Sequence, residues 1–447
     1  PECKNLTPPS TQYKDSLTID SQQLVRQRFI FMTALIFAGE AVYAIPFHVA
    51  RFFRPTVLEV FNLTATELGA AQGVYGIVAM IAYFPGGPLA DRFPARKLLA
   101  CSLWSTALGG VYMTGFPGYI GSIWLWAFFG VTTILFFWAA LIRATRDWGG
   151  NDAQGRAYGL LDGGRGLLAA ALASAGVMIF GLTFPEDAST ASLQEKQDAL
   201  FQVIWGYNIV TVLAGVFVWF AIPDTHPSEA NGKEHTPDGS ISKHIVAVLR
   251  IPAVWMQAVI LLCAYVAYKG FDNYSLFAVD AYGMNEVDAA AIVTIGAWLR
   301  PVAALGAGLL GDRYNVSRML ALSFLFLLAS DLFFAFTTPI AGAVGILLGN
   351  ILIGSTAIFA MRGLYFALLE EAKVPVVMTG TAVGLVSVVG YTPDIFVALV
   401  AGIMIDANPG ATGHQHFFVF LSTFAAIGLV VSLTLMRLLH RNKAAQH

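Results

Sequence analysis

Ionisable side chains lie inside long apolar runs of this sequence. A charged group at the centre of a bilayer costs about 2.5 to 3.5 kcal/mol even on a lenient insertion scale. Those nearest the middle of a run are Glu40, Arg165, Arg300 and Arg362, and those nearer one end are Lys269, Asp272 and Asp394. Each of these groups therefore requires a partner of opposite charge or a water-filled cavity.

Two pairs of opposite charges stand three residues apart, which places both members of each pair on one helix face. The pairs are Asp162 with Arg165 and Lys269 with Asp272. Each pair could neutralise itself and do no more than make a polar cavity tolerable. Alternatively, at least one of these cations, or of the two other arginines named above, binds an anionic group. The planar guanidinium suits a carboxylate, sulfonate or phosphate.

Two acids are candidates for carrying a proton. Glu40 is the first, because a carboxyl group in a cavity of low dielectric constant favours its neutral form and can exchange a proton near neutral pH. The alternative for Glu40 is a permanent salt bridge to an arginine. Asp394 follows Tyr391-Thr392-Pro393, where the proline frees a backbone carbonyl and can interrupt a helix. Asp394 is a second candidate for protonation or ligand binding, and we group Tyr43 and Tyr391 with the same site.

Aromatic and basic residues flank these candidates. Aromatic rings with a polar tip suit the wall of an amphipathic cavity; the candidates for such a wall are Trp138, Tyr75, Tyr268 and Tyr365. We expect His48, Arg51 and Arg54 to form a cluster at the membrane interface, with a proton relay as the alternative.

The sequence shows none of the usual signs of catalysis. It has no nucleophile placed with a base, no metal-ligand cluster such as His-x-x-x-His, and no glycine loop that would hold a phosphate. We therefore expect no enzymatic activity, no catalytic residue, no metal and no cofactor. Basic residues interleaved with aromatics are also missing, which sets nucleic acid aside as a partner.

The composition places most of the chain in lipid. Of 447 residues, 57% are hydrophobic and only 12% are charged, whereas soluble domains carry about 25% charge. The three cysteines are far apart and indicate neither a disulfide framework nor a zinc site. Apolar runs of about 20 residues, the length that spans a bilayer, recur throughout the sequence.

These runs predict twelve membrane spans in two groups of six. The first group is Phe29–Phe52, Glu67–Ala90, Leu98–Phe116, Ile120–Thr145, Ala157–Leu182 and Leu200–Ile222. The second group is Val254–Phe277, Ala289–Gly311, Met319–Phe336, Ile340–Leu369, Val376–Ile405 and His416–Leu439. We therefore divide the chain into a tail (1–28), a first bundle (29–222), a linker (223–250), a second bundle (251–439) and a short tail (440–447).

Lys and Arg concentrate in the loops on one side of this arrangement, and the opposite loops hold only Arg51, Arg54 and Lys196. Because basic loops stay in the cytoplasm, both tails and the linker are expected to be cytoplasmic. The polar N-terminal stretch has no apolar core of a signal peptide. We expect a multi-pass protein of a bacterial inner membrane.

Two short strings recur at equivalent places in the two halves. Gly87-Pro88-Leu89-Ala90-Asp91-Arg92 closes the second span, and Gly308-Leu309-Leu310-Gly311-Asp312-Arg313 closes the eighth. Gln154 to Leu160 likewise corresponds to Thr379 to Leu385. Duplicated halves of this kind predict a binding site at their interface near the midplane, reached alternately from each side.

The loop from Gly87 to Lys97 resembles the signature loop of the major facilitator superfamily, Gly-x-Leu-Ala-Asp-Arg-x-Gly-Arg-Lys. It departs from that pattern at Pro94-Ala95. The resemblance implies an all-α membrane fold of two pseudo-symmetric six-helix bundles. It also implies a cytoplasmic gate, for which the candidates are Gly87, Asp91, Arg92, Arg143, Gly308, Asp312 and Arg313. In such a gate Asp91 faces the positive end of a helix of the other half.

Within that superfamily the fifth and seventh spans are most similar to the organophosphate and organic-anion branch and its bacterial relatives. Gly155-Arg156-Ala157-Tyr158-Gly159 leads to Asp162 and Arg165, and Lys269 lies near the position of a phosphate-binding arginine of that branch. The companion arginine of the first span has no counterpart in Gly39 to Ile45, which argues against phosphate exchange.

Together these features predict a monomeric secondary transporter that moves a small organic anion by alternating access. The solute would be a sugar acid, a sulfonated or phosphorylated sugar, or a carboxylate, in symport with protons or in antiport with a counter-solute. The alternatives are an anion exchanger and a proton-coupled exporter of drugs or lipids. An exporter of that kind should have a large apolar cavity with few buried cations.

Overall fold

The fold is described from a computed structural model, which covers residues 12–150, 154–184, 191–224, 249–365, 367–368 and 376–444. Helix is the only regular structure among these residues. The first half contains α1 (Gln12–Tyr43), η1 (Ala44–His48), α2 (Val49–Phe52), α3 (Arg54–Val60), α4 (Ala65–Arg92), α5 (Ala95–Met113), α6 (Tyr119–Gly130), η2 (Val131–Trp138), α7 (Ala139–Gly149), α8 (Gln154–Thr183) and α9 (Leu193–Ala221).

The second half repeats this plan. It contains α12 (Pro252–Gly270), η4 (Phe271–Asn273), α13 (Tyr274–Tyr282), α14 (Glu286–Tyr314), α15 (Val316–Phe336), α16 (Val344–Leu364), α18 (Val376–Gly390), α19 (Pro393–Ala407) and α20 (Ala411–Ala444). Several of these helices join end to end, so that each half supplies six long helical passes. Most of the predicted linker, 225–248, lies outside the described residues.

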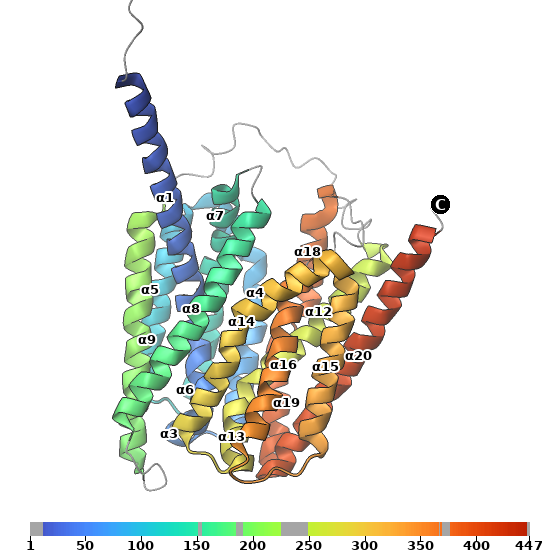
Figure 1. Cartoon of the computed structure of the whole chain (residues 1–447). Helices are drawn as coiled ribbons and strands as arrows, with labels where there is room; N and C mark the ends of the chain where they lie inside the picture. The colour runs from blue at the N-terminus through green and yellow to red at the C-terminus, as the bar shows by residue number, and fades with distance from the viewer. Residues whose placement is uncertain are drawn as a thin grey trace, which may run out of the picture.

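Eleven helical stretches of the described residues are long and apolar enough to cross a membrane. The predicted third span, α5, is not among them. Its 19 residues begin with Arg96 and Lys97 near the amino end and contain several Ser and Thr residues, which lower its mean hydropathy. It nevertheless packs beside α9 in the first bundle (Figure 1), so it completes the set of six helices.

The first helix begins well before the predicted start of the first span. The sequence predicts a span from Phe29, whereas α1 starts at Gln12 and its membrane-length part starts at Val25. The segment from Gln12 to Arg28 contains neither Gly nor Pro, so nothing in the chain interrupts the helix as it leaves the apolar region.

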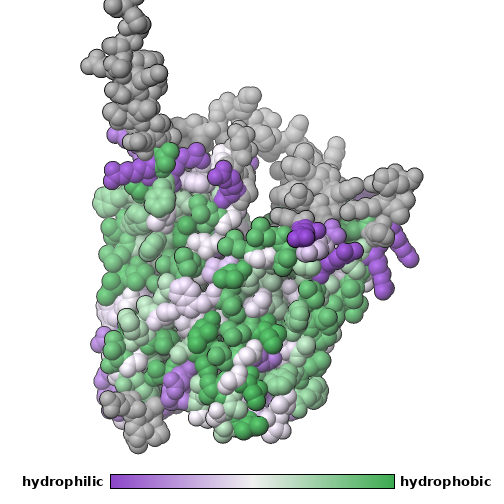
Figure 2. Space-filling view, viewed as in Figure 1, coloured by the Kyte–Doolittle hydropathy of each residue, from purple (hydrophilic) through white to green (hydrophobic). Residues whose placement is uncertain are grey.

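The two halves meet on one side of the molecule and separate on the other. The amino end of α1 and the carboxyl end of α20 lie on the same side, which we call the terminal side (Figure 1). There α7 and α18 stand apart, whereas α3, α13 and α19 converge on the opposite side. The face shown in Figure 2 is mainly hydrophobic between hydrophilic groups near its two ends, as expected for a surface that contacts lipid.

Polar contacts between the halves close the opposite side. Lys196 Nζ lies 2.6 Å from Glu59 and 2.8 Å from Glu286 of the other half. The backbone N–H groups of Ala65 and Thr66 donate to Asp406, at 3.1 and 2.7 Å. Asp406 therefore caps the amino end of α4, where a carboxylate is favoured by the helix dipole. We call this set of contacts the opposite-side clasp.

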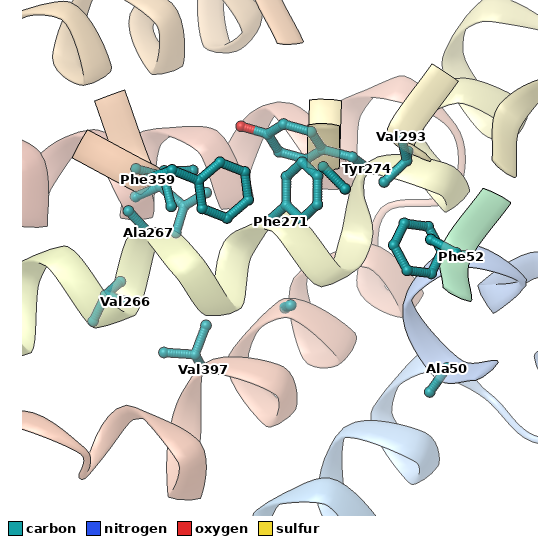
Figure 3. Close-up of a cluster of buried hydrophobic side chains, with 14 of the residues drawn as sticks. Ala50, Phe52, Val266, Ala267, Phe271, Tyr274, Val293, Phe359 and Val397 are labelled. Carbon is teal, nitrogen blue, oxygen red and sulfur yellow. The ribbon is translucent and has the colours of Figure 1, made fainter. Parts of the chain in front are cut away.

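Hydrophobic packing supports the clasp. Phe271 packs on Tyr274 and Phe359 of its own half, with ring centroids 5.2 and 5.9 Å apart. Phe52 of the first half belongs to the same buried cluster, and Figure 3 shows it near the end of that stack. The interface on this side is consequently a packed core with charged contacts around it.

Candidate functional site

A central cavity lies between the halves, and charged and aromatic side chains line it. The lining residues from the first half include Glu40, Tyr43, Phe47, His48, Arg51, Tyr75, Tyr83, Trp138 and Arg165, and those from the second half include Tyr265, Tyr268, Lys269, Arg300, Arg362, Tyr391 and Asp394. Of the four aromatics expected in the wall, Tyr365 is not part of this lining. Sequence candidates from eight separate helical passes thus meet in one place. The candidates Asp162 and Asp272 are not part of the lining but contact lining cations.

Glu40 lies between three basic side chains. Its Oε1 is 3.3 Å from His48 Nε2, and its Oε2 is 3.6 Å from Arg165 Nε and 3.8 Å from Arg300 Nη1. Arg300 also reaches Asp162, at 3.7 Å. Because Arg300 belongs to the second half and both acids to the first, this cluster joins the halves beside the cavity.

The backbone of α1 makes room for Arg165. Arg165 Nε donates to the carbonyl oxygen of Gly39 at 2.9 Å. A Cβ at residue 39 would lie 2.9 Å from Arg165 Cδ, so a side chain there would push the guanidinium away from Glu40. The small residue in the predicted Gly39-Glu40 stretch therefore positions the arginine.

A second cluster connects the cavity to the opposite-side closure. Lys269 Nζ lies 3.1 Å from Asp272 and 3.4 Å from Asp394. Arg51 Nε of the first half donates to the other oxygen of Asp272 at 2.5 Å. The hydroxyl of Tyr265 donates to both oxygens of Asp394, at 3.0 and 3.2 Å, and its ring packs edge-on against Tyr391 at 4.8 Å.

Arg362 differs from the other cations of the cavity. Its guanidinium carbon lies 4.0 Å from the centroid of the Tyr268 ring. In the described part of the chain it has no carboxylate at ion-pair distance, and its buried Nη1 has no hydrogen-bond partner. An arginine held on an aromatic face, with donors free toward a cavity, is suited to an anionic group.

The structure keeps one of the two local pairings expected from the sequence and changes the other. Lys269 and Asp272 form the predicted pair, but Asp162 lies at ion-pair distance from Arg300 and not from Arg165. Arg165 turns instead to Glu40. Spacing along one helix allowed the Asp162–Arg165 pair, and a tertiary partner displaced it.

The expected interfacial cluster of His48, Arg51 and Arg54 is wrong. All three side chains are buried: His48 contacts Glu40, Arg51 contacts Asp272, and Arg54 Nη1 lies 3.4 Å from Gln72. Sequence reasoning therefore missed His48 and Arg51 as lining residues. The available signal was that His48 follows Glu40 by about two helical turns and Arg51 by about three, in an apolar stretch.

A π-helical turn explains why this signal was hard to interpret. Eight residues of α-helix rotate by two turns and roughly 80° more, which would turn residue 48 away from Glu40. The segment η1, which contains Pro46, is π-helical. Its wider turn rotates less per residue, and this brings His48 back onto the face of Glu40.

The predicted gate residues lie at the terminal side, where the halves are apart. Asp91, Arg92 and Arg313 are exposed, and a Cβ at Gly87 or Gly308 would meet nothing within 4 Å. The side chain of Asp312 lies outside the part that the structure describes.

Arg143 was expected to belong to the gate that contains Asp91. It donates to the carbonyl oxygen of Ala90, the neighbouring residue, and lies 3.8 Å from Asp147. The described gate side chains thus lie near the ends of α4, α7 and α14, and no hydrogen bond or ion pair among the described residues joins them to the other half.

Two related six-helix halves around a charged central cavity define a multi-pass membrane transporter. The model of the Major Facilitator Superfamily matches residues 29–398. The chain belongs to this superfamily.

Proteins of Escherichia coli (strain K12) are similar over nearly the whole chain. The inner membrane protein YihN is 26% identical over 423 residues, which cover 94% of this chain and 98% of that protein. The inner membrane protein YqcE is 28% identical over 416 residues, which cover 92% and 94%.

Among solved structures, a bacterial homologue of the human lysosomal transporter Spinster, inward-facing and unoccupied, matches with a TM-score of 0.69 at 14% identity. This match covers 96% of this chain and 99% of that one.

Proposed function

We propose that this protein is a secondary active transporter of a small organic anion. The class of solute we favour comprises sugar acids, sulfonated or phosphorylated sugars, and carboxylates. The supporting observation is the balance of charge around the cavity. Five cations, Arg51, Arg165, Lys269, Arg300 and Arg362, face four acids, Glu40, Asp162, Asp272 and Asp394. One positive charge is left over.

Arg362 carries that excess. The other four cations each lie at ion-pair distance from a carboxylate, so an anion that approached them would first have to displace an internal partner. At Arg362 no such competition exists among the described residues. Tyr268 restrains the guanidinium from one face, which lowers the entropy lost when a solute binds.

The aromatic lining suggests what the rest of the solute resembles. Seven aromatic side chains line the cavity together with the cations: Tyr43, Tyr75, Tyr83, Trp138, Tyr265, Tyr268 and Tyr391. Rings with a polar tip can pack on the faces of a sugar and donate hydrogen bonds to its hydroxyl groups. The high density of charge makes the cavity a poor site for an apolar drug or a lipid.

Transport is by alternating access. The opposite-side clasp closes the cavity on one side, and the halves are apart on the terminal side. With the termini in the cytoplasm, as the basic loops predict, this conformation is open inward. We further propose that the protein acts as a monomer, that the chain divides into the tails, bundles and linker described above, and that a proton gradient drives accumulation.

Binding of anions to the purified protein tests the proposal. The panel is D-glucuronate, D-glucose 6-phosphate, a sulfonated sugar and neutral D-glucose. At least one anion should raise the melting temperature, because a ligand bound only by the folded state stabilises it by about 2.7 kcal/mol at a hundredfold excess over its Kd. Glucose should not.

The variant Arg362→Gln should lose the shift caused by the anion, whereas Arg437→Gln should keep it. Arg437 lies exposed on α20, outside the cavity. An equal shift in wild type and Arg362→Gln, or a shift with glucose as large as with the anions, would refute the proposed solute class.

A further inference from the structure

His48 is a buried imidazole at the edge of the cavity that the solute site does not yet use. Its side chain is 3% exposed, its Nε2 lies 3.3 Å from Glu40 Oε1, and its buried Nδ1 has no hydrogen-bond partner among the described residues. His48 lines the same cavity as Arg165 and Arg300. It can therefore exchange a proton with water that enters this cavity.

The groups around His48 are of both signs. Glu40 of its own span is the nearest charge. Arg165 of α8 and Arg300 of α14 face the other oxygen of Glu40, and Arg51 follows on α2. The rings of Phe52 and Tyr207 cover it edge-on, at 5.5 and 5.9 Å. Glu40 is thus the group that can stabilise an imidazolium at this position.

We infer that protonation of His48 couples the proton to the anion, because it transfers Glu40 from the arginines to the imidazolium. With His48 neutral, Glu40 and Asp162 balance Arg165 and Arg300, and the cluster has no net charge. When one proton from the cavity water binds the imidazole, the cluster gains one positive charge. Added to the excess charge of Arg362, this charge attracts an entering anion more strongly.

The distances favour such an exchange of partners. Glu40 Oε2 lies 3.6 and 3.8 Å from the two guanidinium groups and makes no hydrogen bond to any described residue. These contacts are longer than a hydrogen bond, so little is lost when Glu40 turns to a charged His48. Arg165 then becomes available to the solute beside Arg362, while Arg300 keeps its contact with Asp162. The proton and the anion are bound together from the same side, which is symport.

This inference rests on the proposed anion transport, and two measurements separate their failures. The first needs no solute. Infrared difference spectra of the purified protein between about pH 5 and pH 8, the range in which imidazoles titrate, should contain an imidazole contribution. That contribution should lose the share of one imidazole in His48→Gln, which keeps the seven other histidines of the sequence. A spectrum unchanged by His48→Gln would overturn the role of His48, whatever the solute.

The second measurement is the affinity for D-glucuronate as a function of pH. In wild type it should strengthen on acidification by up to roughly tenfold per pH unit, since coupling between two ligands is reciprocal. In His48→Gln the affinity should be nearly independent of pH. An unchanged pH dependence in the variant would overturn the inference, and a lack of binding of any panel anion by wild type would overturn the proposed function.

The matched control is His414→Gln. His414 is also a buried histidine beside a carboxylate, with Nε2 2.9 Å from Asp280, but it lies on α20 outside the cavity. This variant should keep the pH dependence of wild type. If it loses that dependence as completely as His48→Gln, coupling is not specific to His48 and the inference fails.

Discussion

At the scale of single residues, the site works through the contrast between paired and unpaired charges. Most cavity cations are neutralised by acids of the same cluster, which makes their burial in the membrane tolerable. Arg362 is stabilised by Tyr268, whose ring also lies 4.8 Å from the guanidinium carbon of Arg51. One tyrosine ring thus supports a cation from each half.

The ring of Tyr268 should contribute measurably to anion affinity. Cation–π contacts are worth about 0.5 to 2 kcal/mol, so Tyr268→Leu should weaken binding of the anion by roughly 2- to 30-fold. Tyr268→Phe keeps the ring and should bind nearly as well as wild type. Titration calorimetry on both variants measures the difference. If Tyr268→Phe weakens anion binding as much as Tyr268→Leu does, the hydroxyl group and not the ring face supports Arg362.

The sequence could identify the charged residues of the cavity but not all their partners. Lys269 and Asp272 pair as their spacing predicts, because both belong to one helical segment. Asp162 and Arg165 have the same spacing, yet Arg300 from the other half attracts Asp162. Such competition is decided by distances between helices, which a single sequence does not contain.

At the scale of helices, close packing of α4 on α19 closes the opposite side. One face of α4 carries three glycines, Gly69, Gly73 and Gly76. A Cβ at each of them would come within 2.3 to 2.6 Å of the α19 backbone. Gly402 of α19 faces the start of α4 in the same way, since a Cβ there would lie 2.3 Å from the carbonyl oxygen of Ala65. Small residues let the two backbones approach.

Replacing one of these glycines should favour opening of the opposite side. Gly69→Ala would place a methyl group 2.3 Å from the carbonyl oxygen of Ala398, a backbone atom that cannot move alone. We expect the halves to rock so that the terminal side closes. With the three native cysteines replaced, spin labels at two exposed positions, Phe93 directly after α4 and Tyr314 at the end of α14, should report shorter distances.

The control for this change is Gly349→Ala. Gly349 lies in the interior of α16, and a Cβ there would meet nothing within 4 Å. The distance distribution of this variant should match that of wild type. Identical distributions for Gly69→Ala and Gly349→Ala would contradict the role of the glycine face.

The helical passes could be predicted from the sequence, and their irregularities could not. Apolar length and glycine–proline punctuation were enough to place the spans. The π-helical segments η1 and η2 left no such trace, although both border the cavity through His48, Ile134 and Trp138. A π turn depends on packing around one inserted residue. The sequence therefore could not predict which way the side chains after Tyr43 point around the helix axis.

At the scale of the whole molecule, the charged cavity lies between two halves whose described parts are held together by the opposite-side clasp. Three ion pairs link the halves between the cavity and the opposite side: Arg300 with Glu40, Arg51 with Asp272, and Lys196 with Glu286. The exposed gate residues mark the separated side. The string Gly87 to Arg92 recurs in the second half as Gly308 to Arg313. This repeat predicted the two-fold plan, because duplicated halves fold alike.

Uptake by proteoliposomes tests the central claim most directly, that the excess cation between the halves carries an organic anion across the membrane. The solute is the radiolabelled panel anion that stabilises the protein most, supplied with a pH gradient. Wild type should accumulate it above the outside concentration, and Arg362→Gln should reduce accumulation at least tenfold, a loss of about 1.4 kcal/mol of binding. Equal accumulation by the two proteins would contradict the account.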